Sequence, residues 1–156
     1  MNISFIKSNQ KKEITEKLKE IYGISNLPYL LIESGKEKIR AFSGSLSKEE
    51  ILEISEIAKI EVVGGYLMRQ EGVDDLRLSF DAPLILQEQI TKAIVEIDKD
   101  QFELWIRGND IEIKAEKGNV ILKYNGDFVG CGKSNGLKIF NYVPKDRRLK
   151  TTIKSQ

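Results

Sequence analysis

The sequence predicts an α+β protein in which an antiparallel sheet with flanking helices precedes a small β-barrel. Helical and strand-like patterns alternate through the first 94 residues, whereas short apolar runs separated by Gly and Asn fill most of the rest. A chain of 156 residues suits one domain of ordinary size or two small ones packed together. We therefore expect two units, 1–94 and 95–156.

The first unit should begin with a helix from Asn9 to Gly23, because apolar residues recur there at helical spacing. Asn9 is placed as the N-cap and Gly23 just past the end. Residues 29–32 and 38–42 have the composition of two strands joined by a polar hairpin loop. Ser47 and Glu50 have the spacing of a capping box, which predicts the start of a second helix.

Two more strands are predicted at 60–69 and 76–80. Asp81 is placed to cap a short helix over 82–88, in which a Pro falls in the first turn, where it is tolerated. A further strand is predicted at 93–97.

The second unit is predicted to consist of short strands joined by tight turns, which is typical of a small barrel. The dipeptide Asn125-Gly126 is a strong hairpin signal, because both residues tolerate the positive φ of a two-residue turn. The predicted strands are 103–106, 111–113, 120–124, 128–129 and 137–140.

Positive charge is concentrated at the end of the chain. Residues 117–156 contain nine Lys or Arg and two acids, a net charge of +7, whereas the first 116 residues carry a net charge of −6. The overall formal charge of +1 hides this division. A basic end on an otherwise acidic protein indicates a polyanionic partner, most often RNA or DNA.

Composition excludes several classes of enzyme. The sequence has no His and one Cys, Cys131, so it cannot form a Ser–His or Cys–His nucleophile pair or a His-ligated zinc site. We expect no catalytic residue, metal or cofactor, although carboxylate chemistry with Mg²⁺ stays open on composition alone. No apolar run approaches the ~20 residues of a membrane span, and no secretory signal is recognisable, so we expect a cytoplasmic protein without a membrane partner.

Two glycine motifs suggest phosphate binding to different degrees. The segment 126–134 nearly matches a nucleotide-binding loop, but it has one residue too many, Asp127 where the first Gly should fall, and a turn and strand where a helix should follow. We interpret it as a chance match. Within it, Gly130-Cys131-Gly132 predicts either a tight backbone contact or an exposed turn that approaches a phosphodiester beside Lys133.

The segment 144–150 is the sharpest basic patch. Arg147 and Arg148 are adjacent, so both can face one ligand only if the segment is a turn, an edge or a terminal arm. Bidentate phosphate binding by the two guanidinium groups is the favoured interpretation, and a solvated terminus is the alternative. Five aromatic residues could stack on bases, although core packing is the simpler expectation for each: Phe102, Trp105, Phe128, Phe140 and Tyr142.

Four segments resemble a known domain arrangement: Gly65–Arg69, Leu76–Leu86, Glu103–Asp110 and Phe128–Lys133. Together they are similar to the pre-PUA domain followed by a C-terminal PUA domain of the Nip-seven ribosome-biogenesis family. The length and the domain order match as well. The segment 141–149 also looks like PUA modules attached to RNA cytosine methyltransferases of the NOL/NOP/Sun type.

The Nip-seven resemblance implies a non-enzymatic RNA-binding factor for maturation of the large-subunit rRNA. It implies RNA contacts for Arg147, Arg148, Lys150 and Lys154, and the charge pattern adds others. The full predicted set is Lys133, Lys138, Lys145, Arg147, Arg148, Lys150 and Lys154. The partners expected are rRNA or pre-rRNA and, through the acidic first unit, proteins of ribosome assembly or RNA processing.

We expect a monomer in the cytoplasm, or in the nucleolus or nucleus if the source is eukaryotic. Three other interpretations stay open: a protein–protein adaptor whose basic end meets an acidic partner, a stand-alone PUA accessory protein of an RNA-modification enzyme, and a small enzyme that acts on RNA through carboxylates.

Overall fold

The computed structural model describes residues 4–35, 37–44, 46–57, 65–72 and 75–150. The chain forms two compact units, Met1–Arg77 and Leu78–Gln156. The boundary expected at 94/95 therefore falls inside the second of these units. The residues from Leu78 to the expected boundary belong to the second unit. One contact that joins them to its sheet is the hydrogen bond from the Cys131 thiol to the Ser79 carbonyl, at 3.7 Å.

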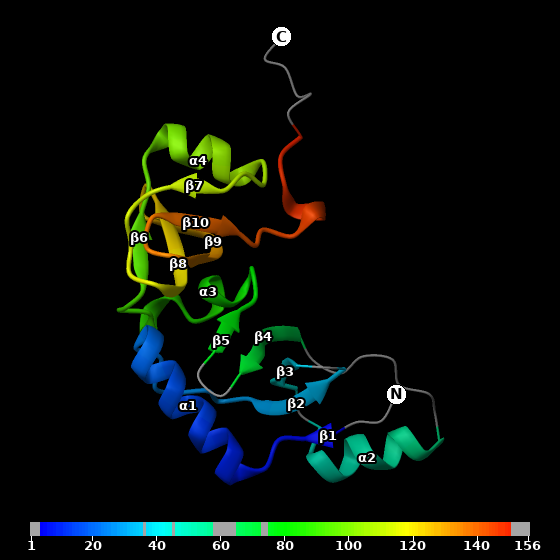
Figure 1. Ribbon diagram of the computed structural model, residues 1–156. Helices are drawn as coiled ribbons and strands as arrows, with labels where there is room; N and C mark the ends of the chain where they lie inside the picture. Colours follow the sequence, from blue (N-terminus) through cyan, green and yellow to red (C-terminus); the bar gives the residue numbers. More distant parts are fainter. Residues whose placement is uncertain (1–3, 36, 45, 58–64, 73–74, 151–156) are drawn as a thin grey trace. The chain divides into compact units, whose positions relative to one another are not determined.

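The first unit is built on an antiparallel sheet with two helices (Figure 1). The strands follow one another in the sheet as they do in the sequence, from β1 to β5, and β5 runs one residue into the second unit. The elements are β1 Ser4–Phe5, α1 Ser8–Tyr22, β2 Leu30–Ser34, β3 Lys38–Phe42, α2 Lys48–Ile57, β4 Gly65–Gly72 and β5 Asp75–Leu78. This is the antiparallel sheet with flanking helices that the sequence predicts. Of the strand expected at 60–69, residues 60–64 lie outside the described part.

The ends of α1 show one prediction confirmed and one wrong. Gly23 has φ 88°, and its N–H donates to the Lys19 carbonyl at 3.0 Å, which closes the helix as expected. The N-cap, however, is Lys7, because the helix begins at Ser8. Asn9 thus lies inside the first turn, and its side-chain oxygen accepts from the N–H of the next residue at 2.9 Å.

The capping box before α2 is confirmed. The Glu50 N–H donates to the Ser47 hydroxyl at 3.1 Å, and the Ser47 N–H donates to the Glu50 carboxylate at 3.0 Å. Two hydrogen bonds with Ser47 hold the pKa of Glu50 below its ordinary value. The bond with the Ser47 backbone has the larger effect, and the bond with the Ser47 side chain has the smaller one.

The second unit is a curled sheet that forms a half-barrel, with helices packed on it (Figure 1). The strand order is β6-β8-β9-β10-β7, with β6 parallel to β8 and the other recorded pairs antiparallel. Its elements are α3 Ala82–Ile85, the 3₁₀ turn η1 Gln87–Gln89, β6 Ile94–Glu96, α4 Lys99–Ile106, β7 Ile111–Glu112, β8 Gly118–Tyr124, β9 Asp127–Ser134, β10 Lys138–Asn141 and the 3₁₀ turn η2 Lys145–Arg147.

The hairpin between β8 and β9 is confirmed at Asn125 and Gly126. Their φ values are 49° and 88°, so both residues have the positive φ that a type I′ turn requires. The two strands that leave the turn pair in antiparallel register from Tyr124 and Asp127 outward.

The strand predicted at 103–106 is wrong, because these residues belong to α4. A capping box starts this helix: the Gln101 N–H donates to the Asp98 carboxylate at 2.8 Å, and the Asp98 N–H donates to the Gln101 side chain at 2.9 Å. The apolar run Leu104–Ile106 is too short to distinguish a buried strand from a buried helical turn, so the cap decides between them.

The core of the second unit surrounds Trp105, which α4 points at the half-barrel and which is fully buried. The indole N–H donates to the Val129 carbonyl at 2.9 Å. Beneath the ring, a Cβ on Gly132 would lie 2.7 Å from the indole and 2.6 Å from the Phe140 carbonyl oxygen, so only glycine fits. The other buried members are Ile97, Ile111, Val120, Leu122, Ile139 and Val143.

Candidate nucleic-acid interface

Strand β10 carries a basic and aromatic face on its outer side. Ile139 points inward and is fully buried, so the alternation of a strand turns Lys138 and Phe140 outward. Phe140 lies directly opposite Lys133 of β9, which places these two side chains on the same face. We call Lys133, Lys138, Phe140 and the following Tyr142 the β10 face; its two aromatic residues are 38% and 37% exposed, respectively.

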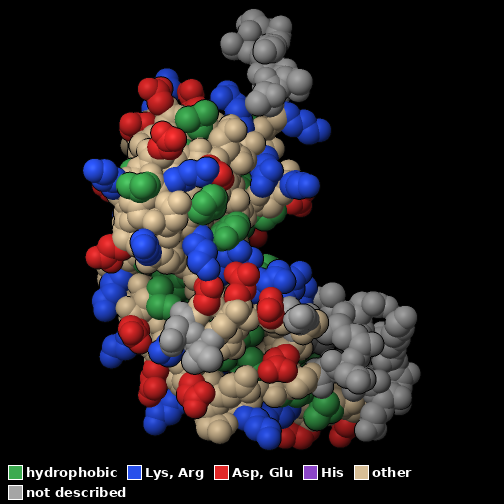
Figure 2. All heavy atoms as spheres, in the orientation of Figure 1, with side chains coloured by type: hydrophobic (Ala, Val, Ile, Leu, Met, Phe, Trp, Pro, Cys, Tyr) green, Lys and Arg blue, Asp and Glu red, His purple; other side chains and the backbone are tan. Residues whose placement is uncertain are grey.

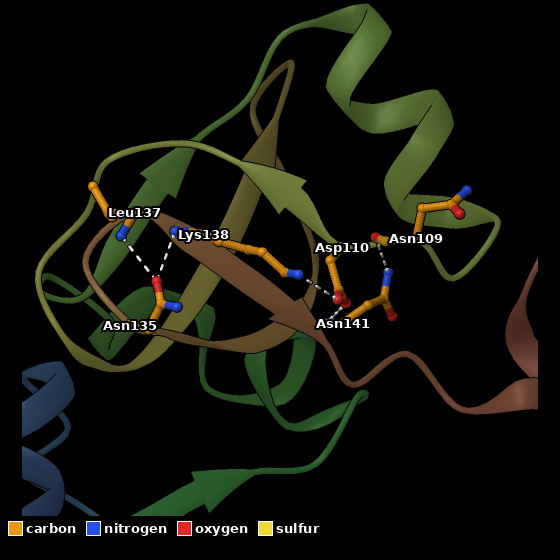
Figure 3. A network of polar contacts seen from close by, with 6 residues as sticks. All are labelled: Asn109, Asp110, Asn135, Leu137, Lys138 and Asn141. Atoms are coloured by element: carbon orange, nitrogen blue, oxygen red, sulfur yellow. Dashed lines mark hydrogen bonds and ion pairs between the residues drawn. The ribbon is translucent and has the colours of Figure 1, made fainter.

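Lys138 lies between an aromatic ring and a carboxylate. Its ammonium nitrogen is 3.6 Å from the Asp110 carboxylate (Figure 3). The same nitrogen lies over the Phe140 ring, 5.1 Å from the ring centroid. Both members of the ion pair are partly exposed, with 40% and 39% of their side-chain surfaces accessible. The pair is therefore weak, and another anion can compete for the ammonium.

Polar contacts fix the far end of β10 to the turn after α4. The Asn141 N–H donates to the Asp110 carboxylate at 2.8 Å. The Asn141 side-chain amide donates to the Asn109 carbonyl at 2.9 Å (Figure 3). It also donates to the Trp105 carbonyl at 2.7 Å. These bonds hold the β10 face in one orientation relative to the core.

The turn before β10 is also locally fixed. The side-chain oxygen of Asn135 accepts from the backbone N–H groups of Leu137 and Lys138, both at 2.9 Å (Figure 3). Leu137 at this turn is 68% exposed. The strand thus enters and leaves through rigid turns, and Lys138 starts from a defined position.

Arg147 makes a bidentate ion pair within the second unit. Its two terminal nitrogens donate to the two carboxylate oxygens of Asp81 at 3.0 and 3.1 Å, and its guanidinium lies 4.6 Å from the Phe80 ring centroid. The hydrogen bond and the charge of Asp81 raise the pKa of Arg147 above its ordinary value. Asp81 is the N-cap residue of α3, as predicted, but its carboxylate makes no cap hydrogen bond.

Arg148 fastens the end of the chain to α4. Its Nε donates to the Val143 carbonyl at 2.9 Å, and its side chain lies so close over Gly108 that a Cβ there would come within 2.5 Å of it. The Leu149 N–H donates to the Ile106 carbonyl at 2.8 Å, at the C-terminal end of that helix. A guanidinium near the C-terminal end of a helix interacts favourably with the helix dipole.

The predicted RNA-binding residues thus separate by environment. β-strand pairing brings Lys133 and Lys138 together on the β10 face, whereas Arg147 and Arg148 point to different partners. Lys145 and Lys150 are exposed and have no ion pair within the described ranges. Lys154 lies outside the described residues.

The segment after β10 contains the 3₁₀ turn η2, and a turn is one of the geometries that the sequence reasoning required for adjacent arginines. In Figure 2, Lys and Arg side chains of this unit gather where Figure 1 places η2 and the residues after it, whereas acidic side chains gather over α4.

The glycine segment 130–132 is a buried part of β9, so the prediction of an exposed phosphate-binding turn is wrong and the alternative of close backbone packing is confirmed. The near-match to a nucleotide loop lies on the same continuous strand, as expected for a chance match. Trp105 packs in the core. Phe102 stacks on Tyr124 at 4.4 Å, so neither of these two residues is available to a base from both sides.

Sequence reasoning missed Asp81 and Asp110, the two carboxylates that contact the predicted cations. Asp81 is 66 residues from Arg147. No local pattern joins residues so far apart, and the pairing appears only once the strands are assembled.

The described residues contain no group of three or more His, Cys, Asp or Glu side chains placed to hold a metal ion. In the same part of the chain, no helix combines the length and apolarity needed to cross a bilayer.

Comparison with known proteins identifies the second unit. Residues 92–149 match the family model described as the PUA domain of the methyltransferase RsmF. The match extends from just before β6 to just after η2, and so includes the half-barrel, α4 and the β10 face. No curated protein matches the chain. Residues 92–149 of the second unit are therefore PUA-like.

Proposed function

We propose that this protein binds RNA through its PUA domain and serves as a non-enzymatic factor in maturation of the large-subunit rRNA. The observation that supports RNA binding best is the coincidence of the PUA match with exposed cations and aromatic rings on the same unit. The resemblance of four sequence segments to the Nip-seven family supports the role in ribosome assembly. On this proposal the protein works as a cytoplasmic monomer without a cofactor.

Phosphate contacts would supply most of the affinity. Lys145 and Lys150 are exposed and make no ion pair with an acid among the described residues. Their ammonium groups can therefore contact a phosphodiester without first breaking such a pair. Lys133 and Lys138 add charge beside the exposed rings of the β10 face. Arg147 can join them only by exchanging the Asp81 carboxylate for a phosphate, and Arg148 contributes through the fold.

A charge-reversal experiment tests RNA binding. The variant Lys145→Glu/Lys150→Glu should bind a structured rRNA fragment more weakly than the wild type. If both residues contact single-stranded phosphates, the negative slope of log K against log salt should become shallower by roughly 1.4. The matched control, Lys99→Glu/Lys114→Glu, makes the same charge change at two exposed positions of the same unit. Equal affinities and slopes for the two variants would remove these lysines from the interface.

The role in ribosome assembly needs a test in cells. Bound RNA would be crosslinked in native extract and the recovered fragments sequenced. Enrichment of large-subunit rRNA, lost in the Lys145→Glu/Lys150→Glu variant, is expected. Recovery of unrelated RNAs without rRNA enrichment would contradict this role while leaving RNA binding intact.

A second candidate is an accessory protein of an RNA cytosine methyltransferase, favoured by the family to which residues 92–149 match. In this case the PUA domain would present RNA to a separate catalytic protein. The candidate predicts that crosslinked fragments contain modified cytosines and that a methyltransferase co-purifies after nuclease treatment. Crosslinks without nearby modified cytosines would argue against it.

A further inference from the structure

We propose that the β10 face is a stacking platform for an unpaired RNA base, with Phe140 under the base and the ammonium groups of Lys138 and Lys133 beside the flanking phosphates. This inference rests on the proposed RNA binding and specifies the class of RNA: a loop, bulge or single strand rather than a continuous duplex.

The position of Phe140 is rigid. Phe140 itself pairs with Lys133 of β9, and the two residues before it pair with β7 on the other side of β10, so the backbone that carries the ring is held in the sheet. The Asn141 bonds to Asn109 and Trp105 fix the end of the strand as well. A ring held in this way loses little side-chain freedom when a base stacks on it, which favours binding.

The ring is also exposed in a suitable environment. Phe140 is 38% exposed, although Ile139 beside it is fully buried, so the ring belongs to the surface and not to the core. Tyr142 follows two positions later with 37% exposure, about 7 Å further along the chain if the extended conformation continues. Aromatic rings on a sheet face are a recurrent way to bind unstacked bases.

Cations lie where the phosphates of a stacked nucleotide need them. Lys138 reaches the edge of the Asp110 carboxylate at 3.6 Å while its ammonium stays 5.1 Å from the Phe140 ring centroid. A phosphate can replace Asp110 in this partly exposed pair. Lys133 stands opposite Phe140 on β9, so charge is present on two sides of the ring.

Helical geometry argues for an unpaired base. In a duplex both faces of each base are covered by its neighbours, so a ring fixed on a sheet can stack only on a terminal or extruded base. The other aromatic residues of the unit are less suitable: Trp105 is buried, and Phe102 already stacks on Tyr124.

Phe128 provides a matched control. Phe128 also lies under a lysine, because the Lys123 ammonium is 5.5 Å from its ring centroid. It is on β9, where it pairs with Lys123 of β8. It is half-buried, and its neighbour is the acidic Asp127, which repels phosphate. The two sites therefore share the ring and the lysine and differ in exposure and local charge.

The experiment uses the full chain with two RNA probes, a single strand of about ten nucleotides containing 2-aminopurine and the same strand in a blunt duplex. The variants are Phe140→Leu, Phe140→Trp and Phe128→Leu. Because Phe140 is on the surface, its replacements should keep the thermal unfolding of the wild type, which circular dichroism would verify.

We expect Phe140→Leu to lose roughly 5- to 150-fold in affinity for the single strand and to lose the quenching of 2-aminopurine. Phe140→Trp should retain both, and Phe128→Leu should bind within about twofold of the wild type. The duplex should show little dependence on residue 140. Together these results would support the platform.

Three outcomes would overturn it in distinguishable ways. If the wild type binds the single strand and Phe140→Leu binds equally well with equal quenching, the platform is refuted and RNA binding stands. If the wild type binds neither these probes nor the rRNA fragment, the platform fails together with the proposed function. An equal loss in Phe128→Leu would show that stacking is not localised on β10 and would also refute the assignment.

Discussion

Replacing Asp81 by Asn should increase the affinity of the protein for RNA. The Asp81 carboxylate receives both terminal nitrogens of Arg147, at 3.0 and 3.1 Å, and so occupies the side of the guanidinium that a phosphate would use. Asn keeps the shape of the side chain but removes the negative charge. Arg147 would then be available to RNA without first breaking an ion pair, and it would keep its contact with the Phe80 ring.

The expected gain follows from counterion release. One additional phosphate contact on a single strand steepens the slope of log K against log salt by about 0.7. At about 0.1 M salt this corresponds to roughly fivefold tighter binding, and to less as salt rises. Stability should change little, because Arg147 and Asp81 are 45% and 51% exposed and exposed pairs contribute little.

The assay is a filter-binding titration of the rRNA fragment at several salt concentrations. Glu88→Gln is the matched control, because Glu88 is exposed in the same unit and loses the same charge without contacting Arg147 in the described structure. A gain and a steeper slope for Asp81→Asn alone would support the exchange of carboxylate for phosphate. Equal behaviour of the two variants, or weaker binding by Asp81→Asn, would refute the reasoning and leave Arg147 with a structural role.

Three other substitutions test the fold. Gly132→Ala should destabilise the second unit by about 1–3 kcal/mol or more in urea unfolding, because its methyl group would lie 2.7 Å from the Trp105 ring; wild-type stability would contradict this packing. Asn141→Ala should cost about 1–3 kcal/mol, because it removes the amide bonds to the Trp105 and Asn109 carbonyls and leaves the Val143 N–H without its acceptor; an unchanged denaturation midpoint would show that water replaces these bonds. Ser47→Ala should partly flatten the acid limb of stability, because it removes the hydroxyl and keeps the backbone N–H that is the larger cause of the lowered Glu50 pKa. The Glu50 pKa is depressed, so its stabilisation is present above its ordinary value of 4.5 and is lost as pH falls through the lower folded pKa; identical acid titrations of the two proteins would count against the capping box.

The elements of the fold that depend on local chemistry could be predicted from the sequence. Gly23 ends α1, Ser47 starts α2, and Asn125-Gly126 turns the chain between β8 and β9. In each case the signal and its partner lie within a few residues. The α+β class and the half-barrel also follow, because strand-sized apolar runs and turn residues alternate along the second half of the chain.

The failures have two physical origins. Residues 103–106 were expected to be a strand because a short apolar run has no unique period, and the Asp98–Gln101 cap that decides for a helix precedes the run. Asp81 takes the N-cap position that its local context predicts, but its carboxylate bonds to a guanidinium 66 residues away instead of capping the helix. Long-range pairing prevailed over local preference.

The candidate site also combines features that the local sequence predicts with features that depend on long-range pairing. The charge pattern located the basic segment but could not show that Arg148 would fasten the chain to α4 or that Lys138 would meet Asp110. The exposure of Phe140 depends on strand register, since the adjacent Ile139 takes the inward position. Register is set by pairing with β7 and β9, and composition alone does not contain it.

The placement of Trp105 gives the molecule a built-in optical reporter. It is the sole tryptophan of the chain, and its indole is sealed inside the half-barrel with its N–H on the Val129 carbonyl. Intrinsic fluorescence excited at the red edge therefore follows melting of the second unit alone, while far-ultraviolet dichroism follows both. Superimposable transitions by the two probes would mean that the units melt as one cooperative block, and separated transitions would mean that each folds on its own.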